Sequence, residues 1–347
     1  MDFSKRFDVC TNFINGNFEK AVKTMDVFDP STGEKITKVH LSTKEDVDVA
    51  VKAAKKAYPS WSNSTIRVRT QFLYKFRELV YEHKQALVDA IVLENGKNEA
   101  EALGDVAKGL ETVEWACSMP QLISGDILKV SRGVTCHDVN EPLGVVACVV
   151  PFNFPFMVPM WTVPIALAAG NCVILKPSEK VPLTMQITAH LMKAAGIPDG
   201  VFQMVHGDVV AVQSICDHPD IVAVSFVGSS KVAEIVSNRC HALNKRVLAL
   251  GGAKNHLVAL DDCDIEMASR DIVASAFGCL GQRCMAASVL ILVGDCEKLL
   301  QRVVERAGAL KAGQKKGQVG PVINAASQQR ILKYVNGAMQ YVFTLFH

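Results

Sequence analysis

Between residues 143 and 252, short apolar stretches alternate with longer segments of helical pattern. The runs LGVVACVVPF, NCVILKPS and IVAVSFVGSS each lead into proline or serine, and segments such as PLTMQITAHLMKAAG lie between such runs. Strands that are apolar on both faces and are joined by helices belong in a parallel sheet that helices cover on both sides. The sequence therefore predicts an α/β fold built on a doubly wound parallel sheet.

The segments before residue 143 extend this prediction. Residues 14–36 alternate in polarity and contain turn residues, which predicts small strands. Residues 124–142 have the pattern of a polar hairpin outside the alternation. We expect helices at 42–58, 65–96 and 98–119, and Ser42 or Thr43 supplies the cap of the first one.

Composition limits the class of protein. A chain of 347 residues exceeds one small core, so two domains are expected. The net charge of +2, without a basic stripe, argues against nucleic acid as a partner, and the absence of a run of about 18 apolar residues argues against a membrane span. The eleven cysteines are scattered, which favours reduced thiols inside a cell over disulfides. We predict neither a metal site nor a secretory signal, and any transit peptide is absent or already removed.

Three loops follow the carboxyl ends of predicted strands, where such sheets bind ligands. In VVPFNFPF, Asn153 could stabilise an oxyanion, although a turn asparagine is the stronger interpretation of the loop alone. In LKPSEKVP, Lys176 and Glu179 are either a solvated pair or a ribose site, where the carboxylate would favour NAD over NADP. In FVGSSKVA, Gly228 and Ser229 either bind phosphate through free backbone N–H groups or form a simple turn.

The stretch GQRCMA, residues 281–286, places a cation beside a thiol. Arg283 could bind an anionic ligand, lower the pKa of the Cys284 thiol, or lie on a loop without a role. Cys284 is one cysteine among eleven, and most cysteines are small buried hydrophobic residues.

Taken in order and spacing, PFNFP, KPSE, FVGS and GQRCMA give the chain a specific resemblance. From about residue 12 to about residue 337 it resembles the aldehyde dehydrogenase superfamily. Within that superfamily it is similar to the CoA-acylating methylmalonate-semialdehyde dehydrogenases. This second resemblance rests on LENGK, GDVAKGLETVEWACS, PLGVVACVVPFNFPFMVPMW, CDHPDIVAVSFVGS and GGAKNH.

The resemblance implies a role for each candidate residue. Cys284 is the nucleophile that attacks the aldehyde, and Asn153 with the Cys284 backbone N–H holds the oxyanion while hydride passes to NAD. Arg283 and Lys108 hold the substrate carboxylate, although the family usually has arginine where this chain has Lys108. The implied cofactor site comprises Val150, Phe152, Lys176, Glu179, Lys180, Gly228 and Ser229.

One departure from the superfamily indicates the acyl acceptor. Hydrolytic members have a glutamate beside the LGG motif, and this chain has Ala249 there. Without that base, attack by water on the thioester loses a contribution of roughly 10²–10⁴-fold, so CoA is the expected co-substrate. The implied reaction is oxidation of malonate or methylmalonate semialdehyde by NAD, with decarboxylation, to acetyl-CoA or propionyl-CoA. The resemblance places it in valine and thymine breakdown, in the mitochondrial matrix of eukaryotes or in the bacterial cytoplasm.

The resemblance also implies a domain division. We expect an NAD-binding domain at 1–123 and 143–252, a bridging hairpin at 124–142, and an incomplete α/β catalytic domain at 253–347. Family members form homodimers and homotetramers, which the lack of a C-terminal strand would impair here. We expect residues 339–347 to be unrelated to the family, and the segment after about residue 285, with its apolar run at 288–294, to pack poorly. The alternative function is an inactive fragment that acts only as an interaction partner.

Overall fold

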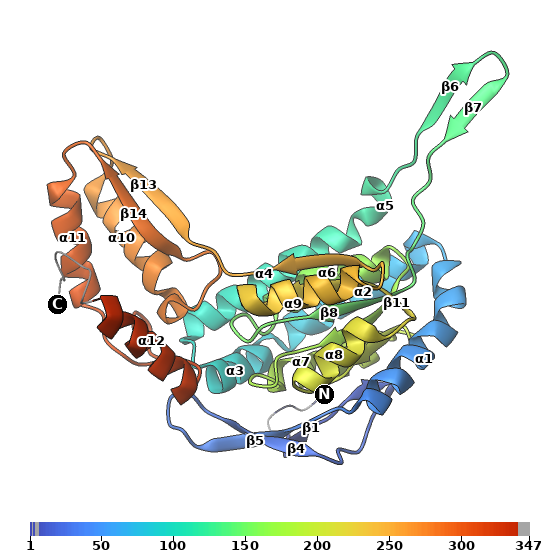
Figure 1. Cartoon of the computed structure of the whole chain (residues 1–347), viewed down its shortest axis with the longest axis horizontal. Helices are drawn as coiled ribbons and strands as arrows, with labels where there is room; N and C mark the ends of the chain where they lie inside the picture. The colour runs from blue at the N-terminus through green and yellow to red at the C-terminus, as the bar shows by residue number, and fades with distance from the viewer. Residues whose placement is uncertain (2, 4–6, 339–347) are drawn as a thin grey trace.

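A parallel sheet forms the centre of the molecule in the computed structural model, which describes residues 1, 3 and 7–338 (Figure 1). Within the described residues, seven strands lie in the order β12-β11-β8-β9-β10-β2-β3. The five parallel strands are β8 (Val145–Val149), β9 (Cys172–Lys176), β10 (Phe202–Met204), β11 (Ile221–Val227) and β12 (Arg246–Leu250). The short β2 (Phe13–Ile14) and β3 (Asn17–Phe18) add antiparallel strands at one edge.

Helices cover both faces of this sheet, so the doubly wound prediction is confirmed. On one face lie α1 (Lys44–Ser62), α8 (Val209–Asp217) and α9 (Ser230–His241). On the other lie α6 (Met157–Ala168) and α7 (Leu183–Ala195), with α2 (Ile66–Glu82), α3 (Lys84–Asn95) and α4 (Glu99–Cys117) outside them. Helix α1 covers the sheet because one of its sides is apolar: Val47, Val51 and Ala54 recur at helical spacing and are fully buried.

The structure divides one predicted helix of the N-terminal part in two and decides between the two predicted caps of another. The expected helix at 65–96 is two helices, because the chain turns at His83 and lets α3 pack on α4 and α7. The cap of α1 is Thr43, whose hydroxyl accepts from the Asp46 N–H while the Asp46 carboxylate accepts from the Thr43 N–H at 2.8 Å. The predicted small strands are present: β1 (Val9–Cys10), β4 (Thr24–Phe28) and β5 (Lys35–His40) form a separate sheet in the order β1-β5-β4.

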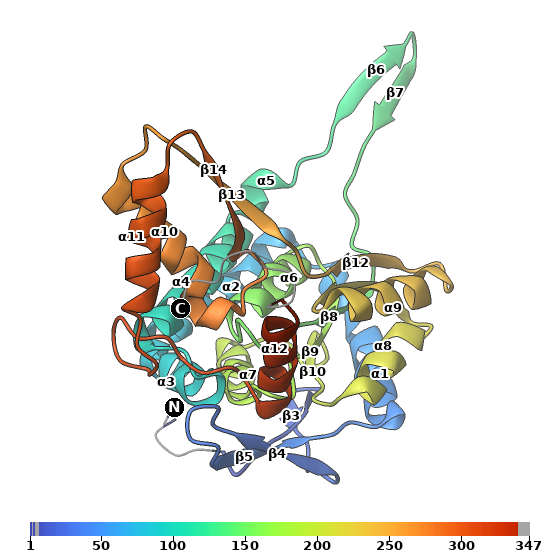
Figure 2. The same cartoon turned by 60° about the vertical axis from the view of Figure 1, so that its left-hand side comes forward.

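The predicted hairpin extends away from the rest of the molecule (Figure 2). It follows the short helix α5 (Met119–Leu122) and consists of β6 (Ile127–Ser131) and β7 (Val134–His137), which pair antiparallel. We expected a polar hairpin, but several of its exposed side chains are apolar. Ile127 is 70% exposed, and Leu128, Val130 and Val134 are also exposed. Isolated hairpins with apolar surfaces are marginal in water, so this surface fits contact with another protein.

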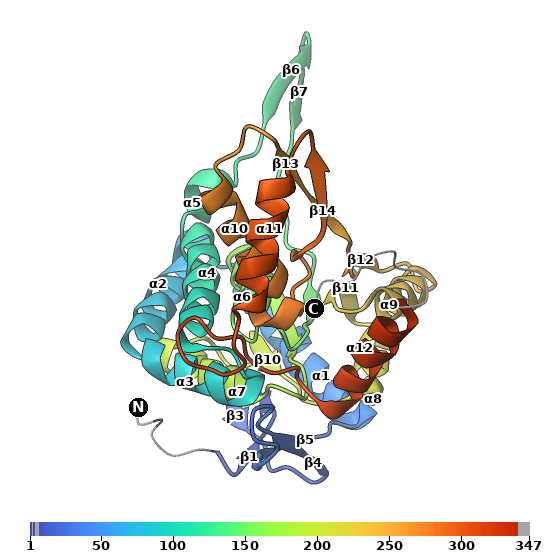
Figure 3. The same cartoon turned by 90° about the vertical axis from the view of Figure 1, so that its left-hand side faces the viewer.

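A second, smaller unit follows β12. Its strands β13 (Asn255–Leu260) and β14 (Ala287–Val293) pair in parallel, and the helices α10 (Ile265–Phe277) and α11 (Glu297–Gly308) pack on them around a small apolar core. The chain after β12 also forms a short 3₁₀ turn, η1 (Gly278–Gly281), and the helix α12 (Ala325–Ala338), which is labelled in Figure 3. The segment after residue 285 forms β14, α11 and α12, and few of its side chains are buried, in line with the poor packing that we expected: Leu299 is the buried residue of α11, and α12 has none. One face of the strand pair is also exposed, at Val258, Leu260, Ile291 and Val293.

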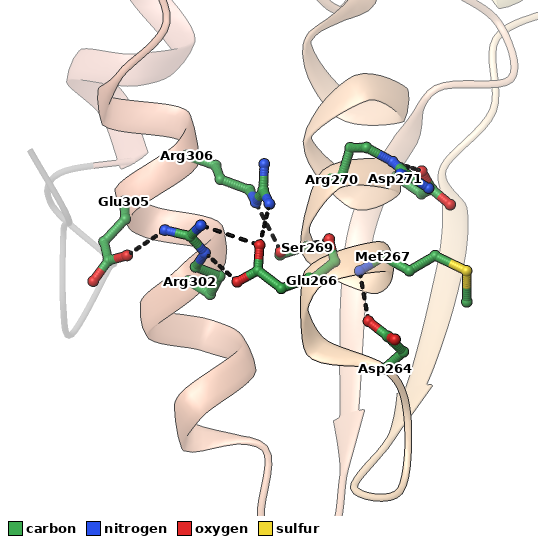
Figure 4. A network of polar contacts seen from close by, with 9 residues as sticks. All are labelled: Asp264, Glu266, Met267, Ser269, Arg270, Asp271, Arg302, Glu305 and Arg306. Carbon is green, nitrogen blue, oxygen red and sulfur yellow. Dashed lines mark hydrogen bonds and ion pairs between the residues drawn. The ribbon is translucent and has the colours of Figure 1, made fainter.

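Charged side chains join the two helices of this unit (Figure 4). The Glu266 carboxylate of α10 accepts from Arg302 Nε at 2.7 Å and from Arg306 Nη2 at 2.6 Å, both on α11. Arg306 Nε also donates to the Ser269 hydroxyl at 2.9 Å. These groups are partly exposed, so the network sets the alignment of α11 more than it adds stability.

The buried carboxylate of Glu94 joins α3 to α7. It accepts hydrogen bonds from the backbone N–H groups of Leu183 (2.6 Å) and Thr184 (2.9 Å), and from the Thr184 hydroxyl. Burial raises the pKa of Glu94 to about 7, against the lowering effect of these donors. The start of α7, and with it the loop after β9, is therefore positioned by a group that titrates near neutral pH.

Replacing Glu94 with glutamine is expected to remove a pH dependence of stability. Because the pKa of Glu94 is raised from 4.5 to about 7, the folded chain binds this proton more tightly than the unfolded chain does. Its contribution is fully present below pH 4.5 and is lost as the pH rises through about 7, a change of about 3 kcal/mol in the free energy of unfolding.

Urea unfolding at about pH 5 and about pH 8 measures this change. The exposed Glu78→Gln is the matched control and should keep the wild-type dependence. Equal pH dependence in Glu94→Gln and the wild type would contradict the assignment.

Candidate active site

The loop after β8, residues 150–156 (the asparagine loop), contacts the loop of the second unit that carries the predicted nucleophile, residues 278–286 (the cysteine loop). Asn153 is nearly buried, and its Nδ2 donates to the Gln282 carbonyl at 2.8 Å. The structure therefore brings the predicted Asn153 and Cys284 into neighbouring positions. One amide hydrogen of Asn153 is used in this bond, and the second remains for a ligand.

Polar side chains from α3 and α4 hold the asparagine loop. Asn95 Nδ2 donates to the Phe152 carbonyl at 2.8 Å, and the Met157 N–H donates to Asp105 Oδ1 at 2.7 Å. The second oxygen of Asp105 pairs with Lys97 at 2.8 Å, and both side chains are fully buried. A buried pair of this kind is costly to break, so it makes the path of the loop specific.

The cysteine loop has an unusual backbone before Cys284. Cys279 and Leu280 have φ values of 51° and 50°, and Gly281 follows at 69°. Side chains other than glycine rarely adopt this left-handed region, so surrounding contacts must hold it. The Cys279 N–H donates to Glu101 Oε1 at 2.6 Å, which supplies one such contact.

Asn255 holds the other end of the cysteine loop. Its Nδ2 donates to the carbonyl oxygens of Cys284 at 2.8 Å and Ala286 at 2.9 Å, and the Cys284 side chain is partly exposed. Asn95, Glu101 and Asn255 were not among the predicted site residues. Asn95 lies in the motif LENGK and Asn255 in the motif GGAKNH, so the sequence held a signal for these two residues, but neither motif contains Glu101.

Arg283 forms an ion pair. Its Nη2 donates to Glu101 Oε1 at 2.9 Å, and its guanidinium lies so close to Gly278 that a Cβ there would be 2.3 Å away. Its Nε is buried and has no partner among the described residues. The Arg283 side chain as a whole is 27% exposed, and Cys284 follows it directly in the sequence.

The structure does not bring Lys108 to this site. Its ammonium is exposed and pairs with Glu111 of the same helix at 2.8 and 3.0 Å. Glu101 and Lys108 are seven positions apart on α4, which places them about 10 Å apart along the helix. The predicted pair of cations around a substrate carboxylate is therefore not assembled.

Four predicted cofactor residues at the ends of β8 and β9 form two pairs, Lys176 with Glu179 and Lys180 with Phe152. Lys176 is buried and pairs with Glu179 at 3.1 Å. Burial acts to raise the pKa of Glu179, but the Lys176 charge, hydrogen bonds to the carboxylate and the Lys180 charge together lower it, so the carboxylate is ionised at neutral pH. The Lys180 ammonium lies 5.2 Å from the centre of the Phe152 ring, and the Val150 N–H donates to the Lys176 carbonyl.

The third loop differs from the phosphate site that we predicted. The Gly228 N–H donates to the Leu250 carbonyl at 3.0 Å, so it is not available to a phosphate. Ser229 caps α9 without a side-chain hydrogen bond, and the unpaired N–H groups in the first turn of that helix are the available donors. Ala249 lies beside Phe226 in the neighbouring strand, and residues 246–254 contain no carboxylate.

A groove of about 980 Å³ lies on another side of the cysteine loop. Its lining comes from Phe277 and Leu280, from the turn at 28–33, and from the segments 307–314 and 319–328. None of the predicted site residues lines this groove.

Two further observations concern the described residues alone. They include no helix with the length and apolar character needed to cross a membrane. They also include no group of three or more histidine, cysteine, aspartate or glutamate side chains that could hold a metal ion.

Comparison with known proteins gives consistent results. The sequence profile of the aldehyde dehydrogenase family matches residues 18–346, which extends beyond residue 337, where we expected the resemblance to end. The malonate-semialdehyde dehydrogenase of Lacticaseibacillus casei is 45% identical over 93% of this chain and 67% of its own length. Malonate-semialdehyde dehydrogenase 1 of Geobacillus thermodenitrificans is 43% identical over 93% of this chain and 68% of its own length.

Solved structures agree with these sequence matches. The crystal structure of methylmalonate-semialdehyde dehydrogenase from Oceanimonas doudoroffii has a TM-score of 0.93 at 37% identity, over 96% of this chain and 70% of its own. An NAD⁺ complex of an aldehyde dehydrogenase from Bacillus cereus has a TM-score of 0.92 at 31% identity, over 95% of this chain and 70% of its own. Because the family profile spans residues 18–346 and solved members share the fold over almost all of the chain, this chain belongs to the aldehyde dehydrogenase family.

Proposed function

We propose that this chain oxidises malonate or methylmalonate semialdehyde with NAD and, after loss of CO₂, passes the acyl group to CoA. The contact between Asn153 and the Gln282 carbonyl carries this proposal, since it sets an amide donor beside Cys284. The names of relatives that are 40–45% identical support the substrate. The alternative of an inactive interaction partner has no such support.

The roles of the chain's own residues follow from this geometry. The Cys284 thiolate attacks the aldehyde carbon, and the second amide hydrogen of Asn153 together with the Cys284 N–H stabilises the oxyanion. NAD, when bound, accepts the hydride that leaves the thiohemiacetal. The ionised Glu179 and the buried Lys176 fit the two hydroxyls of the adenosine ribose. Asn255 and Glu101 fix the backbone on both sides of the nucleophile.

The acyl-enzyme is then protected from water. No carboxylate stands at Ala249 or in its neighbours, so no base there activates water. The bond to the β-carboxylate breaks, CO₂ leaves, and the electron pair left on the α-carbon takes up a proton to give the acetyl or propionyl thioester. The thiolate of CoA then attacks the thioester carbonyl and displaces the Cys284 thiolate. A thiolate is a nucleophile without a general base, which favours CoA as the acceptor.

We assign the substrate carboxylate to Arg283. Glu101 takes one Nη of its guanidinium, and the accessible part can still bind a carboxylate beside Cys284. Glu101 is then a positioning residue for both the arginine and the backbone of the cysteine loop.

The remaining parts of the proposal concern assembly and location. The exposed apolar residues of β6 and β7 fit a bridge to a second copy in a homodimer or homotetramer. Similar proteins come from bacteria and include a bovine mitochondrial enzyme, 41% identical over 62% of its length. We place the reaction in valine and thymine breakdown, in the mitochondrial matrix or the bacterial cytoplasm.

An assay of the purified 347-residue chain tests this function. Malonate semialdehyde, NAD and CoA should give NADH and acetyl-CoA, with acetyl-CoA identified by mass spectrometry. Cys284→Ser is the control and should give neither product. Failure of the wild-type chain to form acetyl-CoA above this control would overturn the proposal.

Arg283→Ala is expected to raise KM for malonate semialdehyde by about 10- to 100-fold, because a charge-assisted hydrogen bond contributes about 1.5–3 kcal/mol. Propanal has no carboxylate, so its KM should change little. Steady-state kinetics with both aldehydes measure the two KM values. Arg283→Lys keeps the charge, so it should raise KM for malonate semialdehyde less than Arg283→Ala does. Equal changes for both aldehydes would show that Arg283 serves only its ion pair with Glu101.

Ala249→Glu is expected to turn the enzyme toward hydrolysis. Without CoA, the wild-type chain should release almost no free acid, and the added base should raise this rate by up to about 10²-fold. Trapping the free acid by chromatography measures the rate, and Ala249→Gln is the matched control because it has the same size but cannot act as a base. Rapid hydrolysis by the wild type would contradict the role of Ala249.

Glu179→Gln is expected to weaken discrimination between NAD and NADP. The ionised carboxylate repels the 2′-phosphate of NADP, so its neutral replacement should narrow the ratio of the two Kd values by roughly tenfold. Isothermal titration of each dinucleotide gives both constants. Equal or tighter NADP binding by the wild type would be evidence against this ribose site.

A further inference from the structure

The side chain of Gln282 forms three hydrogen bonds to the backbone. Its Nε2 donates to the Cys279 carbonyl at 3.0 Å and to the Pro321 carbonyl at 3.2 Å, and its Oε1 accepts from the Ile323 N–H at 3.0 Å. Both hydrogens of the amide nitrogen and one lone pair of the oxygen are therefore engaged. The side chain thus joins the cysteine loop to the segment 318–323.

The segment 318–323 is itself held against the turn between α3 and α4. Asn98 Nδ2 donates to the Gln318 carbonyl at 2.9 Å. The backbone at Gly320 lies so close to this turn that a Cβ on Gly320 would be 2.1 Å from the Gly96 carbonyl oxygen. Because backbones packed this closely have little room to shift, the segment gives the glutamine side chain a fixed point of attachment.

The backbone of Gln282 closes the strained turn that precedes it. Its N–H donates to the Cys279 carbonyl at 3.0 Å, so the main chain and the side chain of one residue bind the same oxygen. The turn contains Cys279, Leu280 and Gly281, whose φ values of 51°, 50° and 69° need contacts to hold them. The direction of the Gln282 carbonyl is therefore fixed from two sides, by this turn and by the segment 318–323.

The Gln282 carbonyl determines how the Asn153 amide is oriented. It accepts from Asn153 Nδ2 at 2.8 Å, whereas Asn153 Oδ1 is buried and has no partner among the described residues. A carbonyl oxygen accepts and cannot donate, so an amide turned end for end would place two oxygen atoms against each other. The Gln282 carbonyl thus keeps the nitrogen end of the Asn153 amide toward the cysteine loop.

We propose that Gln282 is a positioning residue that holds Asn153 in the orientation needed for an oxyanion donor. This inference rests on the function proposed above, in which Asn153 stabilises the oxyanion formed when Cys284 attacks a carbonyl carbon. Gln282 acts through Asn153: its side chain fixes the path of the loop, and its carbonyl fixes the amide. Loss of the side-chain bonds should therefore slow reactions that pass through an oxyanion and spare those that do not.

Two reactions of the Cys284 thiolate in the 347-residue chain separate these cases. With p-nitrophenyl acetate, sulfur bonds to the carbonyl carbon, an oxyanion forms, and its collapse breaks the ester C–O bond and releases p-nitrophenolate. With iodoacetamide, sulfur displaces iodide and no oxyanion forms. Mass spectrometry follows both products at Cys284, and Cys284→Ser gives the background.

Gln282→Glu is expected to slow the acylation by about 10²-fold and to change the alkylation little. Glutamate has the same size, but its carboxylate cannot donate to the Cys279 and Pro321 carbonyls. Gln282→Met removes the same bonds without adding a charge and should have the same effect. Gln121→Glu, at an exposed position of α5, is the matched control and should alter neither rate.

A double variant tests whether Gln282 acts through Asn153. Asn153→Ala should slow acylation about as much as Gln282→Met does, and the combination should be little slower than Asn153→Ala alone. Losses that multiply, equal losses in acylation and alkylation, or no acylation of the wild type above Cys284→Ser would each overturn the proposal. Neither reagent needs NAD, CoA or a semialdehyde. A chain that forms no acetyl-CoA but shows this contrast would therefore contradict the proposed function and leave the role of Gln282 supported.

Discussion

The Glu101 carboxylate is the interaction on which the geometry of the site depends. One of its oxygens accepts both from the Cys279 N–H at 2.6 Å and from Arg283 at 2.9 Å. Helix α4, which packs on α6, thereby holds a strained backbone segment of the second unit and Arg283 beside Cys284. Since Cys279 and Leu280 have left-handed φ values, loss of this acceptor would release the segment and move Cys284.

The asparagine and cysteine loops come from different parts of the chain, and helices α3 and α4 hold both. Asn95 contacts the asparagine loop through the Phe152 carbonyl and the cysteine loop through Cys279 Sγ at 3.7 Å. The buried Lys97–Asp105 pair fixes the start of α6. Asn153 and Cys284 are therefore positioned by one buried polar framework, as the proposed roles of oxyanion donor and nucleophile require.

The two units differ in how much of their apolar surface is buried. The larger unit, built on the seven-stranded sheet, has one continuous apolar core. The second unit has a small core and an exposed apolar face at Val258 and Ile291. The hairpin exposes further apolar side chains. Such faces favour association between proteins.

The order of strands and helices, the parallel sheet and the loops that carry Asn153, Glu179 and Cys284 could be predicted from the sequence, because apolar periodicity and turn residues are local properties. The break at His83, the Gly228–Leu250 bond, the Arg283–Glu101 pair and the exposed position of Lys108 could not. The Gly228–Leu250 bond and the Arg283–Glu101 pair depend on groups that are far apart in the sequence, and the break at His83 and the exposure of Lys108 depend on how the helices pack. The sequence by itself determined which elements form and which residues can react, whereas only tertiary packing decided which donors, acceptors and charges are paired.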